Sequence, residues 1–122
     1  MAIANFIKSG DWKAEKHVPV ITIPENIVAN EFFEVKLSVG EEIAHPNTLE
    51  HHIAWYKLFY VQEGSQVIVE LASNIFAAHG ELDNYNDFSF ATRIKLPKPG
   101  KLVALSYCNI HGLWENEVEV KF

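Results

Sequence analysis

The sequence has 122 residues, of which 48% are apolar and 21% are charged, the balance of a soluble globular domain. Its formal net charge is −6 and it contains no basic cluster, which argues against binding to nucleic acid. No long apolar run occurs, so we expect neither a signal peptide nor a membrane span. We expect residues 1–122 to form one domain. The single cysteine excludes an internal disulfide and suits the reducing cytoplasm.

Apolar and polar residues alternate with a period of two along most of the chain, which is typical of β-strands. Turn-forming stretches such as PEN, EGS and PKPGK separate the alternating segments. Seven strands are predicted, at residues 18–24, 33–39, 53–61, 67–71, 88–96, 102–107 and 118–122. Short strands without a helical stretch between them indicate an all-β fold, an immunoglobulin-like β-sandwich of about seven antiparallel strands.

The strand predicted at residues 53–61 differs from the others because both of its faces are apolar. Strict alternation places three of its apolar side chains on one face: Ile53, Trp55 and Phe59. It places three others on the opposite face: Tyr56, Leu58 and Tyr60. A strand that is apolar on both sides is normally covered on both. We expect the core to cover one face, and a subunit interface or a long loop to cover the other.

The stretch LSYCNIHGLWENE contains the only cysteine, Cys108, with His111 three positions later. On a flat strand these two side chains point to opposite faces, so they converge only if the chain turns between them. Asn109 and Gly112 favour such a turn. The thiol could be inert packing, a nucleophile or a metal ligand, and nothing nearby resembles the local signatures of cysteine proteases.

Three further histidines lie in predicted loops or at strand ends: His17, His45 and His51. A β-sandwich commonly gathers its loops at one end, which brings such residues together. One thiolate with several imidazoles favours a transition metal over calcium or magnesium. Zinc and blue copper both stay open, although the only methionine available as an axial copper ligand is Met1. The pattern therefore predicts a redox-active metal site. The remaining histidines, His52 and His79, are interpreted as structural, and His79 is expected in a loop without a partner.

Three segments, SGDWKAEKHVPV, EEIAHPNTLEHHI and LSYCNIHGLWENE, follow one another in this order. Together they resemble the superoxide reductase family, which comprises the neelaredoxins and the iron-binding domain of desulfoferrodoxins. The resemblance covers nearly the whole chain. It implies one mononuclear non-haem iron bound by four equatorial histidines and an axial cysteine: His17, His45, His51, His111 and Cys108. With one cysteine the chain cannot form the four-cysteine centre of longer members, so it looks like the one-iron form.

The resemblance also implies an activity, the one-electron reduction of superoxide to hydrogen peroxide in defence against oxidative stress. It matches Lys16 to a lysine beside the open coordination position and Glu15 to a glutamate that is the sixth ligand of ferric iron. On the residues alone, this pair is equally compatible with a solvated ion pair. A rubredoxin-like electron donor, a homotetramer and a cytoplasmic location are further implications.

Two departures from the family pattern, Leu49 and the stretch LDNYNDFSFA, concern loop shape and assembly rather than the ligands. Two other classes of protein stay open from the residues alone. One is a copper-containing electron carrier, and the other is an immunoglobulin-like binding module whose histidines are incidental.

Overall fold

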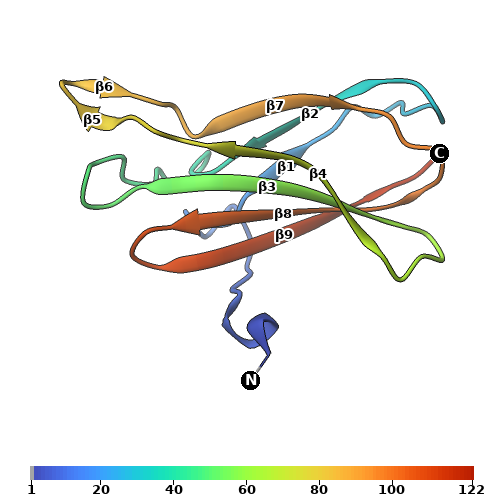
Figure 1. Cartoon of the computed structure of the whole chain (residues 1–122), viewed down its shortest axis with the longest axis horizontal. Helices are drawn as coiled ribbons and strands as arrows, with labels where there is room; N and C mark the ends of the chain where they lie inside the picture. Colours follow the sequence, from blue (N-terminus) through green and yellow to red (C-terminus); the bar gives the residue numbers. More distant parts are fainter. Residues whose placement is uncertain (1) are drawn as a thin grey trace.

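The computed structural model describes residues 2–122, which form one short 3-10 helix and nine strands. These elements are η1 (Ile3–Phe6), β1 (Val20–Thr22), β2 (Phe33–Ser38), β3 (Ile53–Gln62), β4 (Ile68–Ile75), β5 (His79–Glu81), β6 (Asn84–Tyr85), β7 (Ser89–Ile94), β8 (Gly100–Cys108) and β9 (Gly112–Val120). Two antiparallel sheets, ordered β1-β2-β7 and β4-β3-β8-β9, form a sandwich, and β5 and β6 form a separate hairpin (Figure 1). The predicted all-β sandwich is confirmed, and each of the seven predicted strands has a counterpart. Across the described part of the chain, we find no helix with the length and apolar character needed to cross a membrane.

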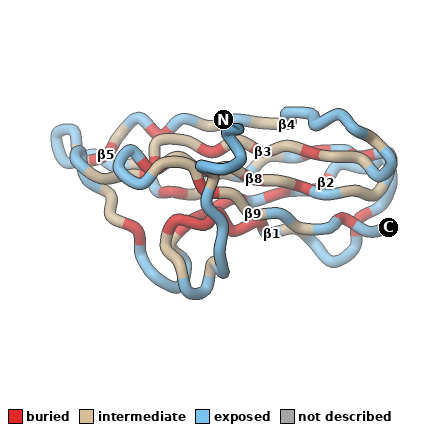
Figure 2. Tube along the Cα trace, turned by 90° about the horizontal axis from the view of Figure 1, so that it is seen from below, coloured by how far each residue is buried: buried red, intermediate tan, exposed pale blue. Residues whose placement is uncertain are grey.

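The core lies between the two sheets because each sheet turns an apolar row toward the other. In β2, the side chains of Phe33, Val35 and Leu37 are buried, and those of Glu34 and Lys36 between them are exposed. This is the alternation that the sequence predicts for a strand with one face in a core. Figure 2 shows how buried and exposed positions succeed one another along the strands, whereas the outer loops are mostly exposed.

Strand β3 carries an irregularity at its start that the sequence does not predict. Its register with β8 shifts so that Ile53 pairs with Cys108 while Trp55 pairs with Tyr107. Ile53 is therefore turned into the core with Tyr56, both 0% exposed, and Trp55 stays half-buried against the Tyr107 ring. The prediction that Ile53 and Trp55 share a face is wrong, because the extra residue of a bulge breaks the alternation.

Several predicted strand boundaries also differ from the structure. The last strand begins at Gly112 and not at Val118, because β9 continues directly from the tight turn that follows β8. The first strand is restricted to Val20–Thr22, although Val18 and Pro19 before it are buried. Proline has no N–H to donate to a ladder, so the pairing starts after it.

The hairpin β5–β6 falls within a region that the sequence does not resolve into strands. Its two turn residues, Leu82 and Asp83, have positive φ angles of 49° and 63°. Two-residue turns of this kind usually carry Asn or Gly, which adopt positive φ without strain. The hairpin therefore lacks the sequence signal by which such turns are recognised.

The loops that carry the histidines gather at one end of the sandwich. The connection between β2 and β3 (residues 39–52), the turn between β8 and β9 (residues 109–111) and the β5–β6 hairpin all lie at the left in Figure 1. The chain ends at the opposite side of the sheets (Figure 1). The expected clustering of loops at one end is thus present.

Candidate metal centre

Four side chains from distant parts of the sequence converge at this end of the sandwich. His17 precedes β1, His45 and His51 lie in the connection between β2 and β3, and Cys108 is the last residue of β8. One nitrogen of each ring and the thiol sulfur all lie within 4.8 Å of one another. Opposite ligands of a transition metal, each bound at about 2.1 Å, lie roughly 4.2 Å apart, so this spacing suits a single ion.

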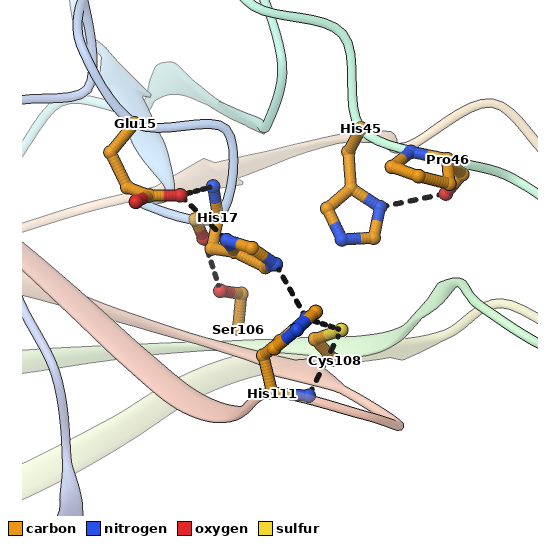
Figure 3. Close-up of polar contacts among 7 residues, drawn as sticks. All are labelled: Glu15, His17, His45, Pro46, Ser106, Cys108 and His111. Atoms are coloured by element: carbon orange, nitrogen blue, oxygen red, sulfur yellow. Dashed lines mark hydrogen bonds and ion pairs between the residues drawn. The ribbon is translucent and has the colours of Figure 1, made fainter.

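His111 joins the same cluster from the turn between β8 and β9. Its Nδ1 lies 3.1 Å from His17 Nε2 and 3.7 Å from Cys108 Sγ (Figure 3). The turn brings it there because Cys108 pairs with Gly112, whose φ of +83° is accessible to glycine. The turn predicted from Asn109 and Gly112 is therefore present. The backbone N–H of His111 also donates to Cys108 Sγ at 3.4 Å.

The segment that carries His17 is fixed from several sides. The hydroxyl of Ser106, a fully buried residue of β8, donates to the carbonyl of His17 at 2.9 Å. The Glu15 carboxylate accepts hydrogen bonds from the backbone N–H of His17 at 3.0 Å and from its Nδ1 at 2.6 Å (Figure 3). The Trp114 ring stacks on the imidazole, with centroids 4.9 Å apart. These contacts direct Nε2 of His17 toward the cluster.

A local hydrogen bond likewise fixes the tautomer of His45. Its Nδ1 donates to the carbonyl of Pro46 at 2.7 Å, which leaves Nε2 as the nitrogen with a free lone pair. The loop approaches its own backbone closely here, since a Cβ on Gly40 would lie 2.7 Å from the backbone nitrogen of His45. Gly40, with a φ of +73°, is therefore required for the position of His45.

The three buried or half-buried imidazoles are neutral at pH 7. Burial lowers the pKa of His45 to about 4, and burial also lowers the pKa of His17 and of His51 below the ordinary value of 6.5. The neutral ring is the form that has a lone pair for a metal.

Two nitrogens in the cluster lack a hydrogen-bond partner among the residues that the structure describes. Nε2 of His45 and Nε2 of His51 are buried and have no hydrogen-bond partner within residues 2–122. An unpaired buried polar atom costs about 1–3 kcal/mol, and a metal ion between the rings would satisfy both nitrogens. One sulfur and several imidazole nitrogens are donors that suit first-row transition metals. The residues present therefore fit a metal ion.

Glu15 and Lys16 flank the cluster. Burial raises the pKa of Glu15, but the hydrogen bonds with His17 outweigh this and lower it overall. Lys16 is half-buried and makes no ion pair within the described residues. After burial and neighbouring groups, its positive charge also contributes to the lowered pKa of His17, His45 and His51.

The structure leaves His52 and His79 outside the cluster but joins them to each other. His79 was expected in a loop without a partner, whereas it is a buried residue of β5. Its ring stacks on that of His52 with centroids 3.5 Å apart and planes within 6°. That part of the expectation is wrong, because the unpredicted hairpin brings His79 over the loop that carries His52.

The fold and the donor set together define a class: a β-sandwich protein with one histidine–cysteine metal centre at the end of the sandwich. The model of the desulfoferrodoxin family matches residues 9–117. The chain belongs to this family, and the resemblance seen in its three sequence segments is confirmed.

Named relatives match nearly the whole chain. It is 47% identical to the superoxide reductase of Pyrococcus furiosus, with 98% of this chain and 99% of the relative covered. It is 42% identical to the neelaredoxin of Megalodesulfovibrio gigas, with 98% of each covered. Among solved structures it is similar to the superoxide reductase (neelaredoxin) from Archaeoglobus fulgidus in the reduced form. The TM-score of that match is 0.88 at 44% identity, and it covers 96% of this chain and 99% of the other.

Proposed function

We propose that this protein is a superoxide reductase that catalyses O2•− + e− + 2H+ → H2O2 at a mononuclear non-haem iron. The observation that carries the proposal is the convergence of one buried thiol with three imidazole nitrogens within 4.8 Å, beside a fourth imidazole. The proposed ligands are His17, His45, His51, His111 and Cys108. When bound, iron would supply a one-electron couple and could bind a small anion.

The chain's own residues prepare the donors for this chemistry. The Pro46 carbonyl and the Glu15 carboxylate hold N–H groups of His45 and His17, so that the opposite ring nitrogens are free to bind. Such outer partners fix the orientation of a ligand and raise its basicity. The N–H of His111 donates to Cys108 Sγ, which reduces and tunes the electron donation of the sulfur.

In this proposal Lys16 attracts superoxide to an otherwise acidic protein. A unit positive charge about 5 Å from an anion, at an effective dielectric constant near 20, contributes about 3 kcal/mol of attraction. Such an attraction raises the rate of capture and makes it depend on ionic strength. The position of Lys16 next to His17, with no competing ion pair in residues 2–122, supports this role.

Glu15 has two roles in the proposal. Its carboxylate holds the His17 ring, as the 2.6 Å contact supports. Glu15 would also be the sixth ligand of ferric iron, through a carboxylate oxygen.

The reaction needs an electron from outside, and we propose a small rubredoxin-like iron protein as the donor and the cytoplasm as the location. We also propose a homotetramer. Its support is the outer side of the larger sheet, where β4 exposes Ile68 and Ile75 and where Trp55 and Tyr107 are only half-buried. An edge strand with exposed apolar residues favours association. Light scattering of the purified protein measures the assembly directly.

Metal analysis paired with a superoxide assay tests the function. We expect one iron per chain, a thiolate-to-ferric absorption band in the visible, and superoxide consumption that requires an added reductant. Copper in place of iron would indicate an electron carrier, and absence of metal would indicate a binding module. Turnover without any reductant would identify a dismutase.

A further inference from the structure

The stacked pair of His52 and His79 links the β5–β6 hairpin to the loop that carries two of the proposed ligands. The parallel rings are 3.5 Å apart, close to van der Waals contact over the whole face. His52 directly follows His51, and both precede β3. A nitrogen of His51 lies in the metal cluster, whereas the ring of His52 lies against the hairpin.

His79 is a fixed support for this contact. It is 6% exposed, and its Nε2 donates to the carbonyl of Phe76 at 2.8 Å. Its backbone N–H donates to the Glu81 carboxylate at 2.8 Å. The start of the hairpin is held further by Asn86, whose side-chain oxygen accepts hydrogen bonds from the backbone N–H groups of residues 77 and 78. The ring of His79 therefore has little freedom to move.

The loop on the other side of the stack is closed by its own hydrogen bonds. The backbone N–H of His51 donates to the Thr48 hydroxyl at 3.0 Å, and Thr48 N–H donates to the His51 carbonyl at 3.0 Å. Nδ1 of His52 donates to the Thr48 carbonyl at 2.9 Å. Two side-chain contacts of Asn47 also join the loop to the hairpin. Its Nδ2 donates to the Asn86 carbonyl at 2.8 Å, and its Oδ1 lies 3.4 Å from Nδ1 of His79. The loop is thus a small rigid turn that moves with His52.

The turn between β8 and β9 holds the backbone of His52 from the opposite side. The His52 N–H donates to Asn109 Oδ1 at 2.8 Å, and the Asn109 N–H donates to the His52 carbonyl at 3.2 Å. Asn109 directly follows Cys108. The residue after His51 is therefore clamped between the cysteine turn and the hairpin, and the orientation of the His51 ring depends on both.

We propose that His79 is a positioning residue: by stacking on His52, it holds the loop so that His51 is directed at the metal centre. The inference rests on the proposed iron site and extends it to a hairpin that supplies no ligand. Groups that orient a metal ligand typically change metal affinity about 10–100-fold when removed. Because His79 acts through one intermediate residue, the low end of that range applies.

The test measures the rate at which the purified iron-loaded protein loses iron to excess EDTA, together with the visible band of its ferric form. We expect His79→Ala to accelerate iron loss about tenfold and to shift the band. His79→Phe, which keeps a flat ring, should stay within about twofold of wild type. His79→Gln, which keeps a hydrogen-bond donor without a ring, should resemble His79→Ala. Asn84→Ala is the matched control, because its side-chain bonds stay within the hairpin turn.

His52→Ala provides an independent arm that leaves the buried hairpin residue intact. We expect the same acceleration from it, and no additional acceleration when it is combined with His79→Ala. If both single variants lose iron at the wild-type rate, or if His79→Phe loses it as fast as His79→Ala, the inference is overturned. A wild-type protein that binds no iron would overturn the proposed function as well, so the two failures are distinguishable.

Discussion

Ser106 connects the cysteine-bearing strand to the segment that carries His17, and its replacement by alanine has a calculable effect. The hydroxyl is 0% exposed and donates to the His17 carbonyl at 2.9 Å. Ser106→Ala removes this donor and leaves a small void. The His17 carbonyl then lacks the hydrogen bond from Ser106. Leaving one buried polar group unpaired costs about 1–3 kcal/mol, and we take about 2 kcal/mol as the expected loss of stability.

That loss converts to a melting temperature through the entropy of unfolding. At about 2.1 cal/mol/K per residue, a chain of this length has an unfolding entropy of about 0.26 kcal/mol/K. A loss of about 2 kcal/mol therefore lowers the melting temperature by about 8 °C. Differential scanning calorimetry measures this change in melting temperature. The variant and the wild type are compared at equal iron content, because bound metal itself stabilises the folded state.

The matched control is Ser89→Ala. The Ser89 hydroxyl donates to the exposed carboxylate of Asp87 at 3.0 Å, so water replaces the partner and we expect a change below about 2 °C. A melting temperature of Ser106→Ala no lower than that of the control would refute the reasoning, because the buried hydrogen bond would then contribute nothing.

Four further predictions address the site and the hairpin. Lys16→Ala should slow superoxide capture at least tenfold and weaken its dependence on ionic strength, since about 3 kcal/mol of attraction is lost. Pulse radiolysis measures the rate of capture, and an unchanged rate contradicts the proposed role of Lys16. Glu15→Ala should alter the ferric absorption spectrum while the ferrous protein still reacts with superoxide; loss of the ferrous reaction counts against that division of roles. Leu82→Asn should stabilise the protein by about 0.5–1 kcal/mol, because Leu82 is 96% exposed and its φ of 49° is better tolerated by asparagine. Thermal melts measure this change, and a lower melting temperature of the variant would exclude strain at this turn. Burial lowers the pKa of His79 below 6.5, so the unfolded chain binds a proton at this ring more readily, and the free energy of unfolding falls as the pH drops below 6.5. His79→Phe should flatten this fall in a pH series of denaturation curves, and an unchanged slope contradicts the lowered pKa of His79.

The strands that border the core could be predicted from the sequence because their environments are simple. Phe33, Val35 and Leu37 alternate with charged residues, and the structure buries the first set and exposes the second. The β5–β6 hairpin could not be predicted, since Leu82 adopts a turn conformation that its side chain disfavours. The bulge that turns Ile53 inward depends on pairing with β8, which is a tertiary contact and leaves no local pattern.

The candidate site shows the same division between local and long-range information. Residue types and motif order indicated which side chains belong together, and the convergence of His17 with Cys108 matches that hypothesis. The contacts that orient these side chains were not predicted. The stacking of His52 on His79, and the hydrogen bond from Ser106 to His17, join residues that no periodicity relates.

That last hydrogen bond spans 89 positions of the chain. Closing a loop of this length from an unfolded chain costs about 4 kcal/mol of entropy, which must be offset by contacts formed elsewhere. The donor cluster can therefore be completed only after the first and last thirds of the polypeptide have met. Iron uptake would then report complete folding. A chain truncated before β8 would contain three of the proposed histidine ligands but not the cysteine.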